Sequence, residues 1–146
     1  MAPIPASQTA DVGADWQMVR KYESAVAINA RLDATPSTQF KDFATSLVLV
    51  HAYAVLQQAL LELRDQGRIS KCRGTLGSLM DASEGHVDWR DLPKVRQGKA
   101  ERDAVAHGLK VVPRGECWAY IRAVEAELSQ WGFLRPNDLS LSREAT

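Results

Sequence analysis

The chain has 146 residues, 45% of them hydrophobic and 25% charged, which is the composition of one globular domain with a single hydrophobic core. Its 18 basic and 18 acidic side chains cancel, so no overall charge attracts nucleic acid or a membrane surface. The two cysteines, Cys72 and Cys117, and the three histidines lack metal-ligand spacing. This predicts free thiols in a reducing compartment, no metal and no cofactor.

The N-terminal segment, residues 1–14, is rich in Ala, Pro, Ser and Thr, and we expect it to be a disordered tail. It lacks a basic stretch followed by an apolar one, so no signal peptide is expected and the predicted location is cytoplasmic. A first helix is expected from Asp15, which can cap it, to Leu32, before a break at Thr35-Pro36-Ser37. Its apolar residues recur at helical spacing: Trp16, Val19, Tyr22, Val26 and Ala30.

The second helix, expected over Thr38–Gln66 and stopped by Gly67, is the longest and most apolar, yet too polar to span a membrane. A helix that is hydrophobic on nearly every side must be covered on every side, so it is either the centre of a bundle or the contact with a partner subunit. His51, Gln58 and Glu62 share one stripe of this helix. They are either polar groups satisfied locally, a second shell that supports a site, or a polar seam in a dimer contact.

Three shorter helices complete the pattern. They are expected around Thr75–Ala82, from Asp91 or Leu92 with Pro93 in the first turn, and over Glu116–Gln130, with a loop over Ser83–Trp89. The last helix has a core stripe of Trp118, Ile121, Val124, Leu128 and Trp131, and Gly132 caps its end. We therefore expect an all-α antiparallel bundle of four to five helices over residues 15–134, followed by a polar C-terminal tail over residues 135–146.

The fourth helix closes with Arg102, Asp103 and, five positions after the arginine, His107, before Gly108 ends it. Five helical steps place the imidazole about 140° round from the guanidinium. The arc between the two also holds Val95, Arg96, Lys99 and Ala106. This helix has few apolar residues, so we expect its polar face to line a solvent-filled site.

Basic residues gather around this helix. Between positions 90 and 114, seven basic side chains outnumber three acidic ones, an excess of four positive charges. The basic ones are Arg90, Lys94, Arg96, Lys99, Arg102, Lys110 and Arg114. The sequence therefore predicts a modest anion-binding patch centred on the end of the fourth helix, although an exposed basic helix face is also often simply solvated.

A long helix pair, a short third helix and an arginine–polar–x–x–x–histidine segment resemble the HEPN superfamily. The specific part of the resemblance is Arg102 to Gly108, where Asp103 occupies the polar position after the arginine. The resemblance implies a metal-independent endoribonuclease, often a toxin or antiviral component, that acts as a homodimer on RNA and is neutralised by a cognate antitoxin. One subgroup has a tyrosine two residues after the histidine, where this chain has Leu109.

The chemistry of these residues fits that implication. A histidine can take the proton of an RNA 2′-hydroxyl or give one to the leaving 5′-oxygen. An arginine can hold a phosphate with two hydrogen bonds and stabilise developing charge. We therefore expect Arg102 and His107 to be catalytic, Asp103 to support them, and Arg96 and Lys99 to bind the RNA backbone.

Two alternatives belong to other classes. The first is a non-catalytic HEPN-like module that binds nucleotides or proteins, in which His107 is only a helix end and the apolar second helix a binding surface. The second, a DNA-binding helix-turn-helix protein, is less favoured because the basic helix ends at its histidine and does not begin with base-reading side chains.

Overall fold

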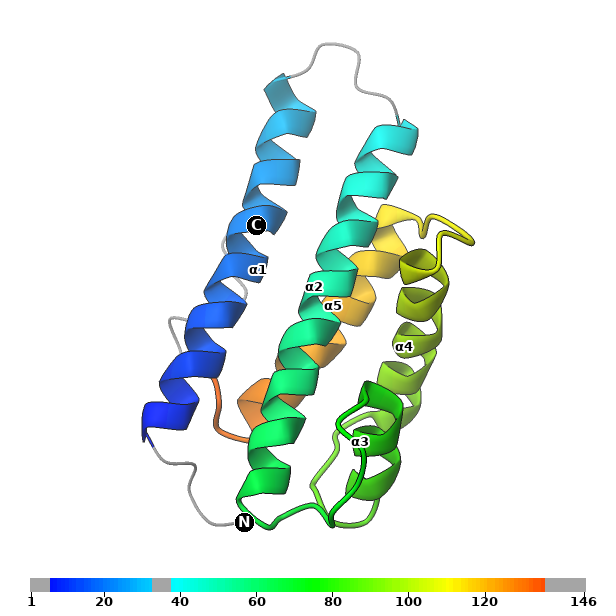
Figure 1. The fold of residues 1–146 in the computed structure, drawn as a ribbon. Helices are drawn as coiled ribbons and strands as arrows, with labels where there is room; N and C mark the ends of the chain where they lie inside the picture. Colours follow the sequence, from blue (N-terminus) through cyan, green and yellow to red (C-terminus); the bar gives the residue numbers. More distant parts are fainter. Residues whose placement is uncertain (1–5, 33–37, 136–146) are drawn as a thin grey trace.

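The computed structural model describes the backbone of residues 6–32 and 38–135, and the side chains of residues 11–27 and 41–135. This part of the chain is all-helical, as expected, and forms a five-helix bundle (Figure 1). The helices are α1 (Ala6–Leu32), α2 (Thr38–Asp65), α3 (Leu76–Ser83), α4 (Leu92–Ala106) and α5 (Arg114–Gln130). In Figure 1, α1 and α2 run side by side, α5 crosses behind α2, and α3 and α4 lie on the far side of α2 from α1.

Helix α1 begins at Ala6, so the expectation of a disordered tail over residues 1–14 is wrong for residues 6–14, while residues 1–5 lie outside the described part. The physical reason is Val12, which is fully buried and extends the stripe of Trp16 and Val19 by one turn towards the N-terminus. Tyr22, which we expected in the same stripe, is instead exposed on the surface.

Helix α2 is the centre of the bundle, because each of the other four helices packs against it. This agrees with the first of the two interpretations of its apolar composition, in which the helix is the centre of a bundle. By length and composition alone Lys41–Asp65 could cross a membrane, but 56% of its apolar window is buried inside the bundle. The large apolar side chains of Phe43 and Leu47 on this helix remain exposed, with 52% and 53% of their surface accessible.

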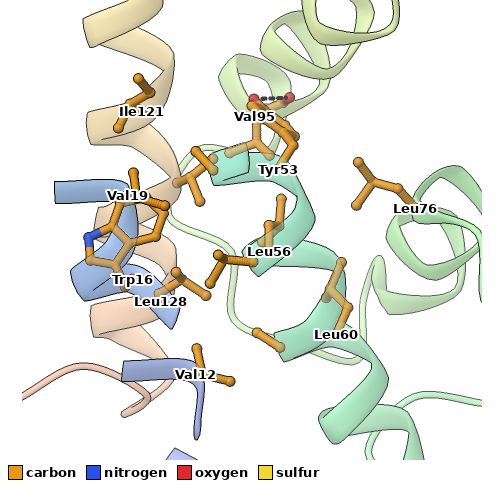
Figure 2. Packing of buried hydrophobic residues seen from close by; sticks show 14 of the residues in the cluster. Val12, Trp16, Val19, Tyr53, Leu56, Leu60, Leu76, Val95, Ile121 and Leu128 are labelled. Carbon is orange, nitrogen blue, oxygen red and sulfur yellow. Dashed lines mark hydrogen bonds between the residues drawn. The ribbon is translucent and has the colours of Figure 1, made fainter. Parts of the chain in front are cut away.

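The core lies where α1, α2 and α5 meet, and it continues towards α3 and α4 (Figure 2). Trp16 of α1, Leu56 of α2 and Leu128 of α5 lie close together in that view, and all three are fully buried. Burial of a side chain of this size stabilises a fold by about 1.5–3 kcal/mol. Tyr53 extends from α2 to α4, where its hydroxyl donates a hydrogen bond to the carbonyl of Val95 over 2.8 Å.

A polar network joins the first and last helices. The indole Nε1 of Trp16 donates to the Glu125 carboxylate over 2.8 Å. Arg122 contacts the same carboxylate and also pairs with Glu23 on α1. Burial raises the pKa of the Glu23 carboxyl above its ordinary value, although the neighbouring Arg122 opposes that shift.

The expected breaks and tails fall partly outside the described residues. The Thr35-Pro36-Ser37 break and residues 136–146 of the C-terminal tail belong to the parts that are not described. Helix α5 begins at Arg114, two residues before the expected Glu116. In its core stripe Trp118 is only partly buried, and Cys117 lies in the core beside it.

Candidate functional site

Two carboxylates hold the start of α4. Asp91 is the N-cap, and its side chain accepts a hydrogen bond from the backbone N–H of Lys94, with Pro93 in the first turn as expected. The buried Glu127 of α5 accepts two more, from the backbone N–H groups of Arg90 at 2.7 Å and Asp91 at 2.9 Å. Because α5 fixes these two residues, the direction of the whole helix is set at this end.

The other end of α4 stops at a glycine in the left-handed conformation. His107 is the C-cap, and Gly108 follows with φ 72°. Two backbone hydrogen bonds close the turn, from Gly108 to the carbonyl of Val105 and from Leu109 to the carbonyl of Ala104, which is the Schellman motif. The histidine is therefore held at a defined helix end, with its ring exposed to solvent.

Asp103 joins the candidate site residues. Each of its two carboxylate oxygens accepts a hydrogen bond from a different cationic side chain, one from Lys99 Nζ at 2.6 Å and the other from Arg102 Nη1 at 2.8 Å. Partial burial raises the pKa of the Asp103 carboxyl, but its hydrogen bonds to Lys99 and Arg102 outweigh burial, and the pKa lies below its ordinary value. The carboxylate is therefore ionised at neutral pH and leaves the three side chains with one net positive charge.

The same residue positions His107 through its main chain. The ring Nδ1 lies 3.1 Å from the Asp103 carbonyl oxygen, which can only accept a hydrogen bond. Nδ1 therefore carries the proton, and Nε2 is the basic nitrogen of the neutral ring. Arg102 and His107 do not touch each other in the described structure, and Asp103 is the residue that both contact.

The two side chains lie on different sides of α4. Val95, which we expected on the polar face, is fully buried, and Arg102 lies only about 20° round from it. As a result Arg102 lies between Val95 and Gly98 around the helix, on the packed side, with 24% of its side chain exposed. The expectation that one polar face carries all the site residues is wrong, because the packed face of α4 runs through Val95 and Gly98.

Arg96 is directed across to α3. It pairs with Asp81 at 3.0 Å and with Glu84 at 2.7 Å. Between α3 and α4 lies a groove of about 290 Å³. It is lined by Gly77, Met80, Asp81, Arg96, Lys99, Ala100 and Asp103, but not by Arg102 or His107.

The basic patch is largely compensated in space. Five of its seven cations form ion pairs, and their partners include three acids from outside the sequence window: Asp42, Asp81 and Glu84. With these three added to the window's own three acids, seven positive charges face six negative ones, and the excess falls from four to one. A count along the chain missed this because α2 and the α3 region supply the added acids.

In the stripe of His51, Gln58 and Glu62, the His51 side chain is directed towards α1. The His51 ring packs edge-on against Tyr22 of α1, with 5.4 Å between ring centroids. Tyr53, two residues further along α2, hydrogen-bonds to Val95 of α4. Because two helical steps turn the side-chain direction by about 160°, His51 points away from α4. The second-shell interpretation therefore has no support for His51, which contacts α1, while Gln58 is exposed and Glu62 is partly buried.

Tyr53, Tyr120 and Glu127 lie beneath α4 and support the site, and they were not singled out from the sequence. Gly98 lies directly against Tyr53 and Tyr120, since a Cβ added there would be 2.1 Å from the Tyr53 hydroxyl oxygen. A glycine within a helix is a sequence signal for such a close approach. The third is Glu127, a buried acid in a helical stripe, and it gives no comparable signal.

The thiols agree with the expectation of free cysteines. Cys117 is buried, its Sγ contacts Ser46 Oγ at 3.9 Å, and burial raises the pKa of the thiol to about 11. Among the described residues, no group of three or more His, Cys, Asp or Glu side chains could hold a metal ion. Comparisons of the chain with protein-family models, curated proteins and solved structures found no match.

Proposed function

We propose that the chain is a metal-independent endoribonuclease of HEPN type, with Arg102 and His107 as its catalytic residues. The observation that carries the proposal is the double role of Asp103. Its carboxylate holds the Arg102 guanidinium and its carbonyl holds the His107 ring, so one helical turn orients both groups. A cation and a basic imidazole nitrogen held at one helix end suit a phosphodiester with a neighbouring hydroxyl.

The chemistry uses the 2′-hydroxyl of RNA as the nucleophile. His107 Nε2 takes the 2′-hydroxyl proton while the 2′-oxygen forms a bond to phosphorus. The bond from phosphorus to the 5′-oxygen then breaks, and an imidazolium donates the proton that the leaving oxygen needs. Arg102 donates hydrogen bonds to the non-bridging oxygens, where charge builds. The products are a 2′,3′-cyclic phosphate and a free 5′-hydroxyl.

A homodimer supplies the second imidazole in this proposal. Exposed apolar side chains near His107 favour such a contact, because Leu109 is 78% exposed and Val111 is 45% exposed. The Ser46 hydroxyl accepts a hydrogen bond from the N–H of Val112 and donates one to its carbonyl, and these bonds hold the loop between α4 and α5 against α2. Two His107 rings brought together at this end would act as base and acid.

The test is cleavage of a fluorescently labelled RNA at neutral pH with EDTA present. We expect cutting by the wild type, and a loss of about a hundred- to a thousand-fold in rate for Arg102→Ala and for His107→Ala. His86→Ala is the matched control, because His86 is also exposed and lies in the turn after α3. Absence of cleavage by the wild type, or equal cleavage by His107→Ala, would contradict the proposal.

The biological setting follows from the same proposal. An RNA-cleaving chain in the cytoplasm would act as a toxin or antiviral component and would need a cognate antitoxin. Expression in bacteria should then arrest growth, and His107→Ala should relieve the arrest. Growth arrest that persists in the variant would separate toxicity from RNA cleavage.

The second candidate is a non-catalytic HEPN-like module that binds nucleotides or another protein. The ion pairs of the basic patch favour it, since Arg96 is held by Asp81 and Glu84 and Lys99 by Asp103. Under this alternative the wild type binds a nucleotide or a partner protein but leaves RNA intact in the EDTA assay.

A further inference from the structure

The carboxylate of Asp103 bridges two cations in a way that an external anion could reproduce. One oxygen lies 2.6 Å from Lys99 Nζ and the other 2.8 Å from Arg102 Nη1. Both contacts are charge-assisted, and two oxygens of a phosphate can accept the same two hydrogen bonds. The pair of cations is therefore already arranged around an anion, and that anion is part of the chain.

Part of this arrangement lies at an open groove. Lys99 and Asp103 both line the space of about 290 Å³ between α3 and α4, while Arg102 does not line it and reaches the Asp103 carboxylate at its edge. Gly77 leaves room on the α3 side, where an added Cβ would be 3.5 Å from Lys99 Cε, an ordinary contact distance. An anion in the groove would reach the Lys99 ammonium directly, at the position that the Asp103 carboxylate now occupies.

The pairing of Arg102 with Asp103 is also imperfect. Adjacent residues on a helix do not face each other, so the guanidinium must bend round to reach the next side chain. Its Nε–H is buried and has no hydrogen-bond partner in this arrangement. A buried donor without a partner weakens the arrangement that contains it. An external anion is free of the constraint that sequence adjacency places on Asp103.

We propose that Lys99 and Arg102 form a phosphate-binding site, that the Asp103 carboxylate occupies it in the free protein, and that a phosphate binds by displacing Asp103. The identity of the natural ligand as an RNA phosphodiester rests on the proposed function. The site itself is defined by the two cations and takes a phosphate group of any origin. Asp103 then acts as an internal competitor that sets the affinity of the site.

The test is isothermal titration of inorganic phosphate into the wild type and into Asp103→Asn at low salt. The amide keeps the size of the side chain but removes its charge, so we expect phosphate to bind roughly tenfold more tightly to the variant. Adding Lys99→Met to Asp103→Asn should abolish the gain. Circular dichroism of each variant checks that the helices are intact.

Asp81→Asn is the matched control. Asp81 lines the same groove and its loss changes the net charge equally, but its partner is Arg96 and not Lys99 or Arg102. An equal gain in Asp81→Asn would mean that overall charge controls binding, and would overturn the proposal. No gain in Asp103→Asn would overturn it as well.

The outcome is separable from that of the proposed function. If the wild type never cuts RNA but Asp103→Asn gains phosphate affinity, the site stands and the nuclease does not. If RNA is cut in a His107-dependent way but Asp103→Asn gains no affinity, the nuclease stands and the internal competitor does not.

Discussion

Replacing Gly98 by alanine tests how closely α4 packs on the bundle. An added Cβ would lie 2.1 Å from the Tyr53 hydroxyl oxygen and 2.8 Å from Tyr120 Cδ1, both far inside normal contact distance. Tyr53 is fully buried, and its hydroxyl already bonds to the carbonyl of Val95. The methyl group can fit only if this hydroxyl moves or if α4 shifts outward.

The magnitude follows from three contributions. Overpacking of a rigid core costs about 1–3 kcal/mol. Displacing the Tyr53 hydroxyl from its acceptor leaves a buried polar group and costs about 1–3 kcal/mol more. The usual gain of about 1 kcal/mol from alanine in place of a helical glycine offsets part of this. We therefore expect Gly98→Ala to lower the free energy of unfolding by about 3 kcal/mol.

Urea denaturation followed by circular dichroism measures this difference. Gly77→Ala is the control, because its Cβ would meet only the flexible Lys99 side chain at 3.5 Å, and it should leave stability unchanged or raise it by up to about 1 kcal/mol. Adding Tyr53→Phe to Gly98→Ala removes the atom in the closest contact and should recover part of the loss. A Gly98→Ala protein as stable as the wild type would refute the reasoning.

Three further predictions concern ionisable groups. Glu127→Gln replaces one of the two carboxylate oxygens that accept hydrogen bonds at the start of α4 with an NH₂ donor. We expect urea denaturation to show that the free energy of unfolding falls by about 2–3 kcal/mol, and unchanged stability would contradict this role of Glu127. The pKa of Asp103 is lowered in the folded protein, so its ion pairs stabilise the fold above its ordinary pKa and the contribution is lost as acid protonates it. The stability difference between wild type and Asp103→Asn should therefore begin to shrink as the pH falls through about 4 and vanish only below the lowered pKa of the folded protein, and a difference that grows in acid would reverse the sign. Burial raises the pKa of the Cys117 thiol to about 11, so iodoacetamide should label Cys72 first in the folded protein. Peptide mass spectrometry measures the two labelling rates, and equal rates would contradict the burial of Cys117.

Local helix signals account for most of what could be predicted from the sequence. Thr75 caps α3 through its side chain, and Asp91 caps α4 in the same way. Gly67, Gly108 and Gly132 follow helix ends with positive φ angles, as their positions in the pattern indicated. These features depend on neighbours within a few residues, so a single sequence contains the information needed to place them.

Features that depend on distant segments could not be predicted in this way. The charge balance around α4 changed because acids distant in the sequence pair with the cations of the basic patch: Asp81 and Glu84 with Arg96 on α4, and Asp42 of α2 with Arg114 at the start of α5. The face of α4 that packs became clear only once Tyr53 and Tyr120 were placed against Gly98. The start of α1 was missed because its first turns are rich in small residues, and Val12 gains its stabilising role from burial in the bundle.

The bond between Trp16 and Glu125 has a consequence for the order in which the chain assembles during synthesis. These two residues are 109 positions apart, so α1 and α2 leave the ribosome long before the acceptor of the indole N–H exists. A nascent α1–α2 hairpin would expose one apolar flank and a tryptophan without its carboxylate until α5 emerges. Helix α1 thus completes its contacts only after α5, which lies far later in the chain, has been made.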